Sequence, residues 1–344
     1  MWKYVLKRIG LAIVTTFLIL SLTFILMNLL PFEKPIGNDF AKLTYYQAQV
    51  NQGFVTSFIK ETPGYGELLW KYELNGQMQY YYQTPVMTQY FSWLKNIVTE
   101  WNWGVSRQLE PNVSAMQIIG KRLPVSMSIN ILSVIVSVPL GILLGVVAAL
   151  KKNKPTDHII STGIMIFISI PSFVLITILM LVFCYNLGWL PTKWPTETMP
   201  TADKVLGYIL PVVCLSFGSI CGYARFTRAE LCEVMSSDYL LLARTKGLTK
   251  RQAILRHALR NAMVPIVPSI LAEFIMILSG SMILENLYGI PGIGKIFVDA
   301  LSMKDYSVLL VDMAIFTSIG LFAGVILDIS YGFIDPRIRM GAKK

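Results

Sequence analysis

The chain has 344 residues, of which 54% are hydrophobic and only 15% are charged, and its mean hydropathy is +0.57. Soluble domains carry roughly 25% charged residues, so this composition excludes an ordinary soluble protein and indicates one that crosses a membrane several times. The formal net charge of +10 is also found in nucleic-acid-binding proteins. Lys and Arg beside apolar spans, however, are typical of a membrane topology signal, and we predict no nucleic-acid partner.

The first apolar run, residues 9–30, predicts a membrane-spanning helix. As a helix it would extend about 33 Å, which is enough to cross a bilayer. Lys3, Lys7 and Arg8 precede it, as basic residues precede a signal peptide, but the run is longer than the apolar core of a signal and no small-residue cleavage site follows. We therefore expect residues 1–30 to form an N-terminal tail and a retained first span.

Residues 31–124 form a long loop, rich in Tyr, Gln, Asn and Trp, without a second apolar span. The loop predicts a small extracellular domain. Trp93, Trp101 and Trp103 lie near its end, where aromatic side chains are more often anchors in the headgroup region than ligand-binding groups. We expect them to be anchors.

Residues 125–334 predict a core of five further spans, so the expected fold is an all-α polytopic membrane protein with six transmembrane helices. Several prolines fall inside these runs or at their ends, which predicts kinked helices whose neighbours satisfy the freed carbonyls. The five apolar runs cover residues 125–150, 159–187, 205–223, 262–284 and 308–334.

Lys and Arg set the expected orientation. They gather before the first span, in residues 151–158, in residues 223–261 and in the tail 335–344, whereas the short loops between hold few. The positive-inside rule therefore places both termini in the cytoplasm and the loop 31–124 outside.

The cytoplasmic loop 238–261 has the punctuation of two short helices. Residues 238–246 favour a helix, Gly247 can end it in the left-handed conformation, and Thr249 with Gln252 forms a capping-box signature for the next helix. A compact pair of helices suits force transfer from a soluble partner. An ordinary topogenic loop is the alternative, and a DNA-binding helix-turn-helix is excluded by the flanking spans. One face of the second helix is expected to carry Ala253, Ile254, His257, Ala258 and Asn261.

Acidic residues inside apolar spans are candidates for a substrate or proton path. Glu273 lies nearest the middle of its span and is the predicted polar residue of the pathway, either as a buried contact or along the path. Asp312 and Asp328 lie toward opposite ends of the last span, and we expect them to reach polar groups at the interface. The four cysteines and two histidines form no metal-binding pattern, and no catalytic residue is predicted.

The segment Gly289 to Ile296 nearly matches a phosphate-binding loop, but Ile296 stands where the magnesium-binding hydroxyl is needed and no α/β strand precedes it. Its glycines and proline favour a tight outer turn, or a segment that dips back toward a cavity. We predict that Glu285 to Lys295 forms part of an outer gate. The gate residues are Glu285, Gly289, Pro291, Gly292 and Gly294.

Several motifs in the chain resemble those of ABC importer permeases of the oligopeptide and dipeptide class. The loop 238–261 carries the family pattern, except that Leu241-Leu242-Ala243 stands for Glu-Ala-Ala, a departure common in the peptide branch. Further matches cover nearly the whole chain outside about residues 35–90. They are Lys3-Tyr4, Lys7-Arg8, Trp103-Gly104-x-Ser106, Arg122-Leu123-Pro124, Glu285-x3-Gly289-Ile290-Pro291-Gly292-Ile293-Gly294, Asp305-Tyr306 and Asp328-x2-Tyr331-x3-Asp335-Pro336-Arg337-Ile338-Arg339.

The resemblance implies a non-catalytic permease subunit that forms an oligopeptide path together with a second, homologous permease. It implies two cytoplasmic ATPase subunits, which would bind ATP and magnesium, and an extracellular peptide-binding protein. The residues that it implies for ATPase docking are Asp238, Tyr239, Ala243, Arg244, Lys246, Gly247, Arg256, His257, Asn261 and Pro265. A proton-coupled secondary transporter remains an alternative, as does a dipeptide or nickel importer.

Overall fold

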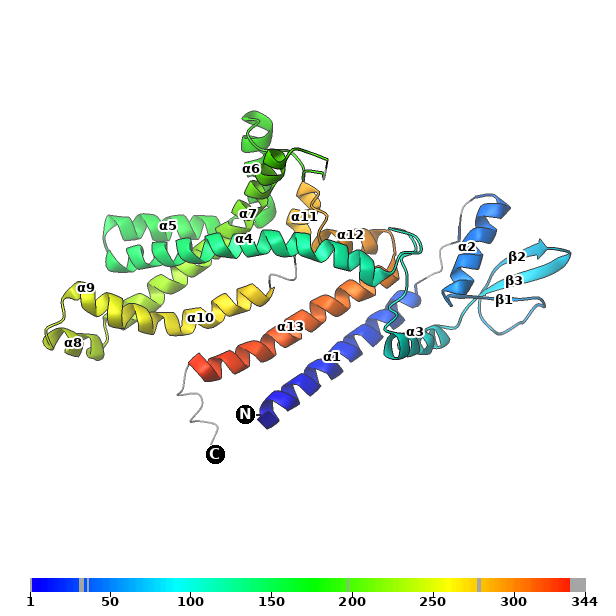
Figure 1. The fold of residues 1–344 in the computed structure, drawn as a ribbon, viewed down its shortest axis with the longest axis horizontal. Helices are drawn as coiled ribbons and strands as arrows, with labels where there is room; N and C mark the ends of the chain where they lie inside the picture. Colours follow the sequence, from blue (N-terminus) through cyan, green and yellow to red (C-terminus); the bar gives the residue numbers. More distant parts are fainter. Residues whose placement is uncertain (1, 31–33, 36, 197, 277–279, 335–344) are drawn as a thin grey trace. The chain divides into compact units, whose positions relative to one another are not determined.

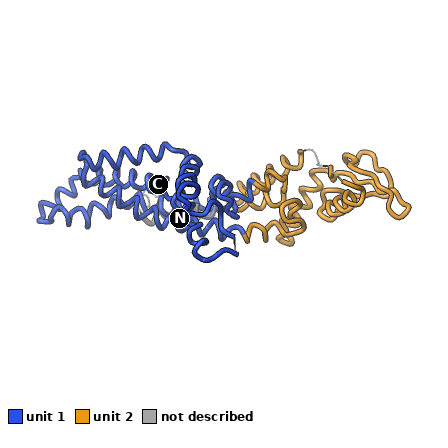
Figure 2. The backbone as a smooth tube through the Cα atoms, turned by 90° about the horizontal axis from the view of Figure 1, so that it is seen from above, with its two compact units in different colours: residues 1–9, 122–298, 319–344 blue, residues 10–121, 299–318 orange. Residues whose placement is uncertain are grey.

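The computed structural model describes residues 2–30, 34–35, 37–196, 198–276 and 280–334 (Figure 1). The chain divides into two compact units (Figure 2). Unit 1 comprises Met1–Ile9, Arg122–Val298 and Ile319–Lys344, and unit 2 comprises Gly10–Lys121 and Asp299–Ser318. The predicted tail and the motif that begins at Asp335 lie outside the described residues.

Long apolar helices dominate the chain, which confirms a helical polytopic membrane protein. In the described ranges, five helical stretches are long and apolar enough to cross a membrane, and a bent pair makes a sixth if it counts as one span. The long helices are α1 (Trp2–Asn28), α4 (Ala115–Leu150), α7 (Thr201–Met235), α10 (Leu259–Met276) and α13 (Tyr306–Ile334).

The apolar run 159–187 is not one straight helix, as a single predicted span would require. It divides between α5 (Pro155–Ser169) and a second stretch made of α6 (Ser172–Leu179) and the π-helical η1 (Met180–Asn186), which bends away by 99°. Pro171 disfavours helical geometry at the residue before it, and Ile170 is extended, with ψ 120°. A break therefore replaces the expected kink.

Helices α4 and α7 pack closely through two glycines of α4. A Cβ atom at Gly141 would lie 2.6 Å from the Cβ of Tyr223, and one at Gly145 would lie 2.6 Å from the carbonyl oxygen of Ala224. Two small residues four apart on one helix face let membrane helices approach, because van der Waals contact replaces the missing hydrophobic driving force. This contact fixes the long helix α7, which also packs against α5, α6 and α10.

The short helices of unit 1 lie between these long ones. Four of them matter for the sites below: α8 (Asp238–Thr245), α9 (Lys250–Ala253), α11 (Met282–Tyr288) and the π-helical η2 (Ile254–Ala258), which joins α9 to α10. A buried apolar cluster holds α11 against α4, α6 and α7, and its members include Ile129, Ile176, Leu210 and Tyr288.

Unit 2 contains two helices and a sheet in the loop before α4, and the sequence did not predict the sheet. Its elements are α2 (Asp39–Asn51), β1 (Val55–Phe58), β2 (Leu68–Leu74), β3 (Gln77–Gln83) and α3 (Val86–Glu100). The strands form an antiparallel sheet in the order β1-β3-β2. Helix α4 already begins at Ala115, ten residues before the predicted second span.

A tight turn and an aromatic core stabilise this sheet. Asn75 and Gly76 both have positive φ, at 54° and 76°, as in the two-residue turn that suits a twisted hairpin. The ring of Tyr46 from α2 stacks on Tyr81 of β3 and on Trp70 of β2. Burial raises the pKa of Tyr46 to about 12, so its phenol stays protonated in the core. The Tyr-rich segment therefore acts as core.

Candidate functional site

The basic loop, residues 238–261, forms two short helices joined at a glycine, as the sequence predicted. Helix α8 begins at Asp238, and Gly247 follows it with φ +92°, a conformation that L side chains rarely adopt. Thr249 and Gln252 then make the reciprocal capping box that opens α9. The backbone N–H of Gln252 donates to Thr249 Oγ1 at 3.3 Å, and the N–H of Thr249 donates to Gln252 Oε1 at 3.1 Å.

The buried face of the second helix differs from the predicted one. Ala253, Ile254 and Ala258 are buried, whereas His257 and Asn261 are exposed, so their predicted place on that face was wrong. The π-helical segment η2 changes the spacing of the buried positions. Its i→i+5 turn brings residues five apart, such as Ala253 and Ala258, closer to one face than a regular α-helix would.

The basic loop rests on unit 1 through a small apolar cluster. Leu240 of α8, only 6% exposed, packs with Ala253, Ala258, Ala149 of α4 and Leu231 of α7. An eight-residue helix is marginal on its own, so these contacts hold α8 in place. A push on α8 would therefore pass through this cluster, to which α4 and α7 both contribute a side chain.

The opposite side of α8 is exposed and unusually apolar. Tyr239, Leu241 and Leu242 are 42%, 62% and 56% exposed, and Arg244 and Lys246 are exposed beside them. A groove of about 240 Å³ runs between α8 and α9, with Asp238, Leu241, Arg244 and Lys250 among its lining residues. Exposed aliphatic groups rimmed by charge are typical of protein interaction surfaces.

The remaining docking residues predicted by the resemblance occupy different environments. Ala243 is half-buried, Gly247 and Arg256 are exposed, and Pro265 lies inside α10, half-buried. Together with the exposed His257 and Asn261, the loop therefore presents most of the predicted set to solvent.

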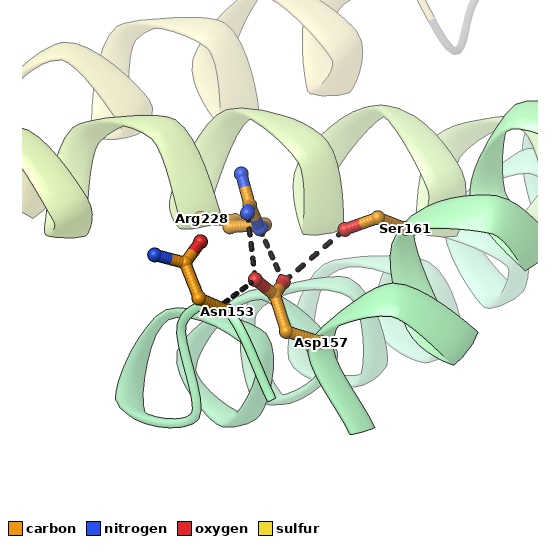
Figure 3. Close-up of polar contacts among 4 residues, drawn as sticks. All are labelled: Asn153, Asp157, Ser161 and Arg228. Atoms are coloured by element: carbon orange, nitrogen blue, oxygen red, sulfur yellow. Dashed lines mark hydrogen bonds and ion pairs between the residues drawn. The ribbon is translucent and has the colours of Figure 1, made fainter. Parts of the chain in front are cut away.

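A buried ion pair ties α5 to α7 about one helical turn before Leu231 (Figure 3). Arg228 donates from Nε and Nη2 to the two carboxylate oxygens of Asp157, at 2.5 and 2.8 Å. The backbone N–H of Asn153 and the hydroxyl of Ser161 also donate to Asp157, at 3.0 and 3.2 Å. Asp157 is 1% exposed, and the two-pronged contact fixes the geometry of both helices.

Sequence reasoning missed this ion pair. Asp157 follows Pro155 at the start of α5, which reads as ordinary helix-start chemistry. Its partner lies 71 positions away. The only available signal was an acidic residue directly beside an apolar run, and it does not name a partner.

The predicted gate residues gather around Glu285, which is 2% exposed. Its carboxylate accepts from the hydroxyl of Ser126 in α4 at 2.7 Å, and from the backbone N–H groups of Ser281 and Lys295 at 3.2 and 3.0 Å. The N–H of Ile293 donates to Ser126 Oγ at 2.9 Å. Burial raises the pKa of Glu285, and these hydrogen bonds oppose the rise. The Glu285 carboxylate thus links the segment 280–295 to α4 through hydrogen bonds.

Glycines allow that segment to fold so tightly. Gly289 ends α11 with φ +71°. A Cβ at Gly294 would lie 2.7 Å from the backbone nitrogen of Met282, and one at Gly292 would overlap the Glu285 carboxylate and Ser126. Ile290 and Tyr288 are fully buried on either side of the turn, and Pro291 follows. The segment is packed against protein.

The acidic residues of the spans all have partners or burial inside the protein. Glu273 of α10 accepts a hydrogen bond from Ser219 of α7 at 2.5 Å, so it makes a partly buried polar contact between two spans. Asp328 pairs with Arg8 at 3.0 Å. Asp312 is fully buried within the protein. The pathway role of Glu273 stays a prediction.

A further carboxylate, that of Asp305, organises unit 2. Asp305 Oδ2 accepts from the hydroxyl of Ser106 at 2.5 Å and from the backbone N–H groups of Arg107, Gln108 and Leu109, at 3.0, 3.0 and 3.1 Å. Four donors around one oxygen fix the loop 106–109 on the segment before α13. Two motifs of the resemblance, Trp103-Gly104-x-Ser106 and Asp305-Tyr306, meet here.

A metal site needs several ligand side chains close together. The described part of the chain contains no group of three His, Cys, Asp or Glu side chains that could hold a metal ion, and its four cysteines are free thiols.

Known proteins with this arrangement are transport subunits. Residues 141–340 match the family described as binding-protein-dependent transport system inner membrane component. The dipeptide transport system permease protein DppB of Lactococcus lactis is 34% identical over 341 residues, covering 99% of this chain and all of that protein. The oligopeptide transport system permease protein OppB of Escherichia coli is 33% identical over 340 residues, covering 98% of this chain and all of that protein.

A solved structure supports the fold. The MetNI methionine ABC transporter in its inward facing conformation matches with a TM-score of 0.51, covering 64% of this chain and 97% of that one, at 15% identity. The chain therefore belongs to the binding-protein-dependent transport system inner membrane component family. It is a multi-pass, non-catalytic permease subunit of the ABC importer type, which confirms the resemblance seen in its motifs.

Proposed function

We propose that this chain is the permease subunit of an ATP-driven peptide importer in a bacterial cytoplasmic membrane. It crosses the membrane six times, with the bent pair α5 and α6–η1 as one span, and both termini lie in the cytoplasm. The small domain of unit 2 lies outside. A second, homologous permease completes the peptide path, two ATPases dock from the cytoplasm, and an extracellular binding protein delivers the peptide.

One observation carries the coupling role, namely the exposed aliphatic and basic face of α8 on a buried base. A loop that only sets membrane topology needs positive charge. Such a loop does not require the exposed side chains of Leu241 and Leu242. Leu240 on the other face anchors the same helix to α4 and α7. A helix with an exposed apolar and basic face and a buried, anchored opposite face fits a docking element for an ATPase cleft.

ATP and magnesium would then bind to the ATPases, and this chain would only undergo the conformational change that the ATPases transmit to it. ATP can shift the membrane subunit between two states only through contacts that differ between them. The face of α8 supplies such contacts. At the far end of the same unit, the segment held by Glu285 is the proposed gate, and Glu273 is the proposed polar residue of the path.

Peptides are the proposed cargo because both relatives named above transport them. Their identities to this chain, 34% and 33%, are nearly equal for the dipeptide and the oligopeptide permease. We therefore assign peptides as a class, without a length.

Reconstitution in liposomes tests the proposal. The chain, its partner permease and the ATPases are combined with the binding protein, and uptake of a labelled peptide is measured with and without ATP. We expect uptake only with the whole set and ATP. Uptake by this chain alone under a pH gradient would replace the proposal with a proton-coupled transporter.

Two variants in α8 and one control variant test the docking face. Leu241→Asp should abolish co-purification of the ATPase and ATP-driven uptake, because it places a carboxylate in an apolar contact. Arg244→Glu should weaken both, whereas Lys152→Glu, a charge reversal on the exposed turn between α4 and α5, should leave both unchanged. Equal losses for Arg244→Glu and Lys152→Glu would show that net charge alone matters.

A further inference from the structure

Helix α3 of unit 2 carries a row of apolar side chains on its exposed surface. Met87, Phe91 and Val98 are 54%, 64% and 75% exposed, and the half-buried Leu94 lies between them. Steps of four, three and four residues keep these four side chains, the apolar row, on one side of the helix for about three turns. In a soluble domain such a row packs against a core, whereas here it faces outward. An exposed apolar surface of this kind marks a site of contact with an apolar partner.

The neighbouring side of α3 is polar. Thr88, Ser92, Lys95 and Thr99, the polar row, are all exposed, and each follows a member of the apolar row by one position. One position turns an α-helix by about 100°, so the two rows lie on adjacent sides. The apolar row contains no charged residue, and Lys95 belongs to the polar row. This division between an apolar and a polar exposed side is typical of a helix that lies in the surface of a bilayer.

A third side of α3 packs on the membrane-spanning helix α1 (Figure 1). The hydroxyl groups of Tyr90 and Ser21 form a hydrogen bond of 2.9 Å, and the ring of Trp93 stacks on the ring of Phe24 with 4.8 Å between their centres. Phe24 is 1% exposed. Both contacts lie within unit 2, so they fix α3 against this part of α1.

These contacts set the depth of α3 in the membrane. The apolar span of α1 runs from Val5 to Asn28, and Ser21 and Phe24 lie inside it, about 10 and 6 Å before its end. Interfacial helices bury their apolar side about 5 to 10 Å into the boundary between headgroups and acyl chains, which is the same depth. At this level α1 itself exposes leucines, since Leu22 and Leu26 are 60% and 56% exposed. Side chains that face lipid have such exposure.

We propose that α3 lies in the bilayer surface, with its apolar row inserted among lipid acyl chains and its polar row in water. The partner is the lipid itself, because a soluble protein would have to enter the headgroup region to reach the apolar row. Trp101, which follows α3 and is 68% exposed, fits the headgroup level, where indole rings are enriched. Trp93 and Trp103 are half-buried in protein instead.

The inserted helix gives the first loop a second attachment to the membrane, beside α1. It goes beyond the proposed transport function and requires only that α1 spans the bilayer.

Spin labels on single cysteines of the full chain in lipid nanodiscs test the depth of each row. Phe91→Cys and Val98→Cys report on the apolar row, and their sequence neighbours Ser92→Cys and Thr99→Cys are the matched controls in the polar row. The four native cysteines are replaced by alanine in every variant, and thermal unfolding checks that each variant is folded. Oxygen concentrates in hydrocarbon and a nickel chelate stays in water. We expect the ratio of oxygen to nickel collisions to be several times higher at positions 91 and 98 than at 92 and 99.

A second measurement keeps the native cysteines. Phe91→Asp places a carboxylate among acyl chains, so the α3 amides should exchange hydrogen about threefold or more faster in nanodiscs. Ser92→Asp adds the same charge to the polar row and should change exchange less than about twofold. Phe91→Leu removes the ring and keeps an apolar side chain, so its exchange should stay near that of the wild type. Equal exchange in Phe91→Asp and Ser92→Asp would contradict insertion into lipid.

The collision ratios also separate the other possible partners. Equal ratios at positions 91 and 92 would place the apolar row in water and overturn the proposal. Exclusion of both oxygen and the nickel chelate from positions 91 and 98, once the second permease is added to the nanodisc, would assign the apolar row to a contact with that subunit. Peptide uptake does not enter either measurement, so a failure of the proposed function would leave the result for α3 unchanged.

Discussion

Leu240→Ala should loosen α8 without unfolding the rest of the protein. Leu240 is 6% exposed and is the buried side chain through which α8 joins the cluster with Leu231 and Ala253. Leu→Ala in a core costs about 2 to 5 kcal/mol, and a site at the edge of a domain relaxes enough to fall near the lower end. We therefore expect about 2 to 3 kcal/mol, taken from the local stability of α8.

Hydrogen exchange measured by mass spectrometry reads that local loss directly. A loss of about 2 to 3 kcal/mol should speed exchange of the α8 amides by roughly 30- to 150-fold, up to the rate of an unfolded segment. Amides of α4 and α13 should exchange as in the wild type. Leu242→Ala changes the same residue type on the exposed side of α8 and should alter exchange less than about threefold, as surface substitutions do. The reasoning fails if both variants exchange alike.

Three further predictions concern the other fixed points of unit 1. Gly247→Ala should cost about 1 to 2 kcal/mol, because alanine must adopt φ near +92°, and should raise exchange in both α8 and α9. Asp157→Asn should lower the thermal midpoint at a cost of about 2 to 3 kcal/mol, less than for a fully buried pair because the Arg228 side chain is 31% exposed; an unchanged midpoint would contradict a structural ion pair. The raised pKa of Glu285 means that its contribution to stability is full below pH 4.5 and is lost as the pH rises through its folded-state pKa. Glu285→Gln should therefore become more stable relative to the wild type from pH 4.5 to 8, and parallel pH profiles would count against this explanation.

Local signals in the sequence were sufficient for the basic loop. Gly247, Thr249 and Gln252 act within one or two turns of chain, so their effect does not depend on the rest of the fold. The structure reproduces both helices and the capping box. The same reasoning failed for His257, because a π-helical turn shifts the face and sequence periodicity assumes a regular helix.

Long-range pairing could not be predicted. Ser106 and Asp305 meet across 199 positions, and Ser126 and Glu285 across 159. Hydrophobic periodicity predicts which face of a helix is buried, but it does not predict which polar side chains pair with each other. The prolines predicted kinked spans without the size of any bend, because a proline in a membrane helix produces anything from a slight kink to a break, depending on its neighbours.

The sheet of unit 2 was missed for a different reason. Its strands have at most seven residues, and Tyr81 and Tyr82 are both buried although they are adjacent, so strict alternation fails. Aromatic residues satisfy both a strand and an interfacial anchor, and the sequence alone does not decide between them.

The Asp157–Arg228 ion pair would act as a pivot if the long helix α7 tilted. The 35 residues of α7, with Pro211 among them, extend about 52 Å, well beyond the roughly 30 Å of a hydrocarbon core, so one helix runs from Thr201 to the residues just before α8. From Arg228 to Thr201 the helix extends about 40 Å, and a tilt of about 5° around the pivot would move its remote end by about 3.5 Å. A small displacement at the end of α7 near α8 would thereby be magnified at the more distant end, at Thr201.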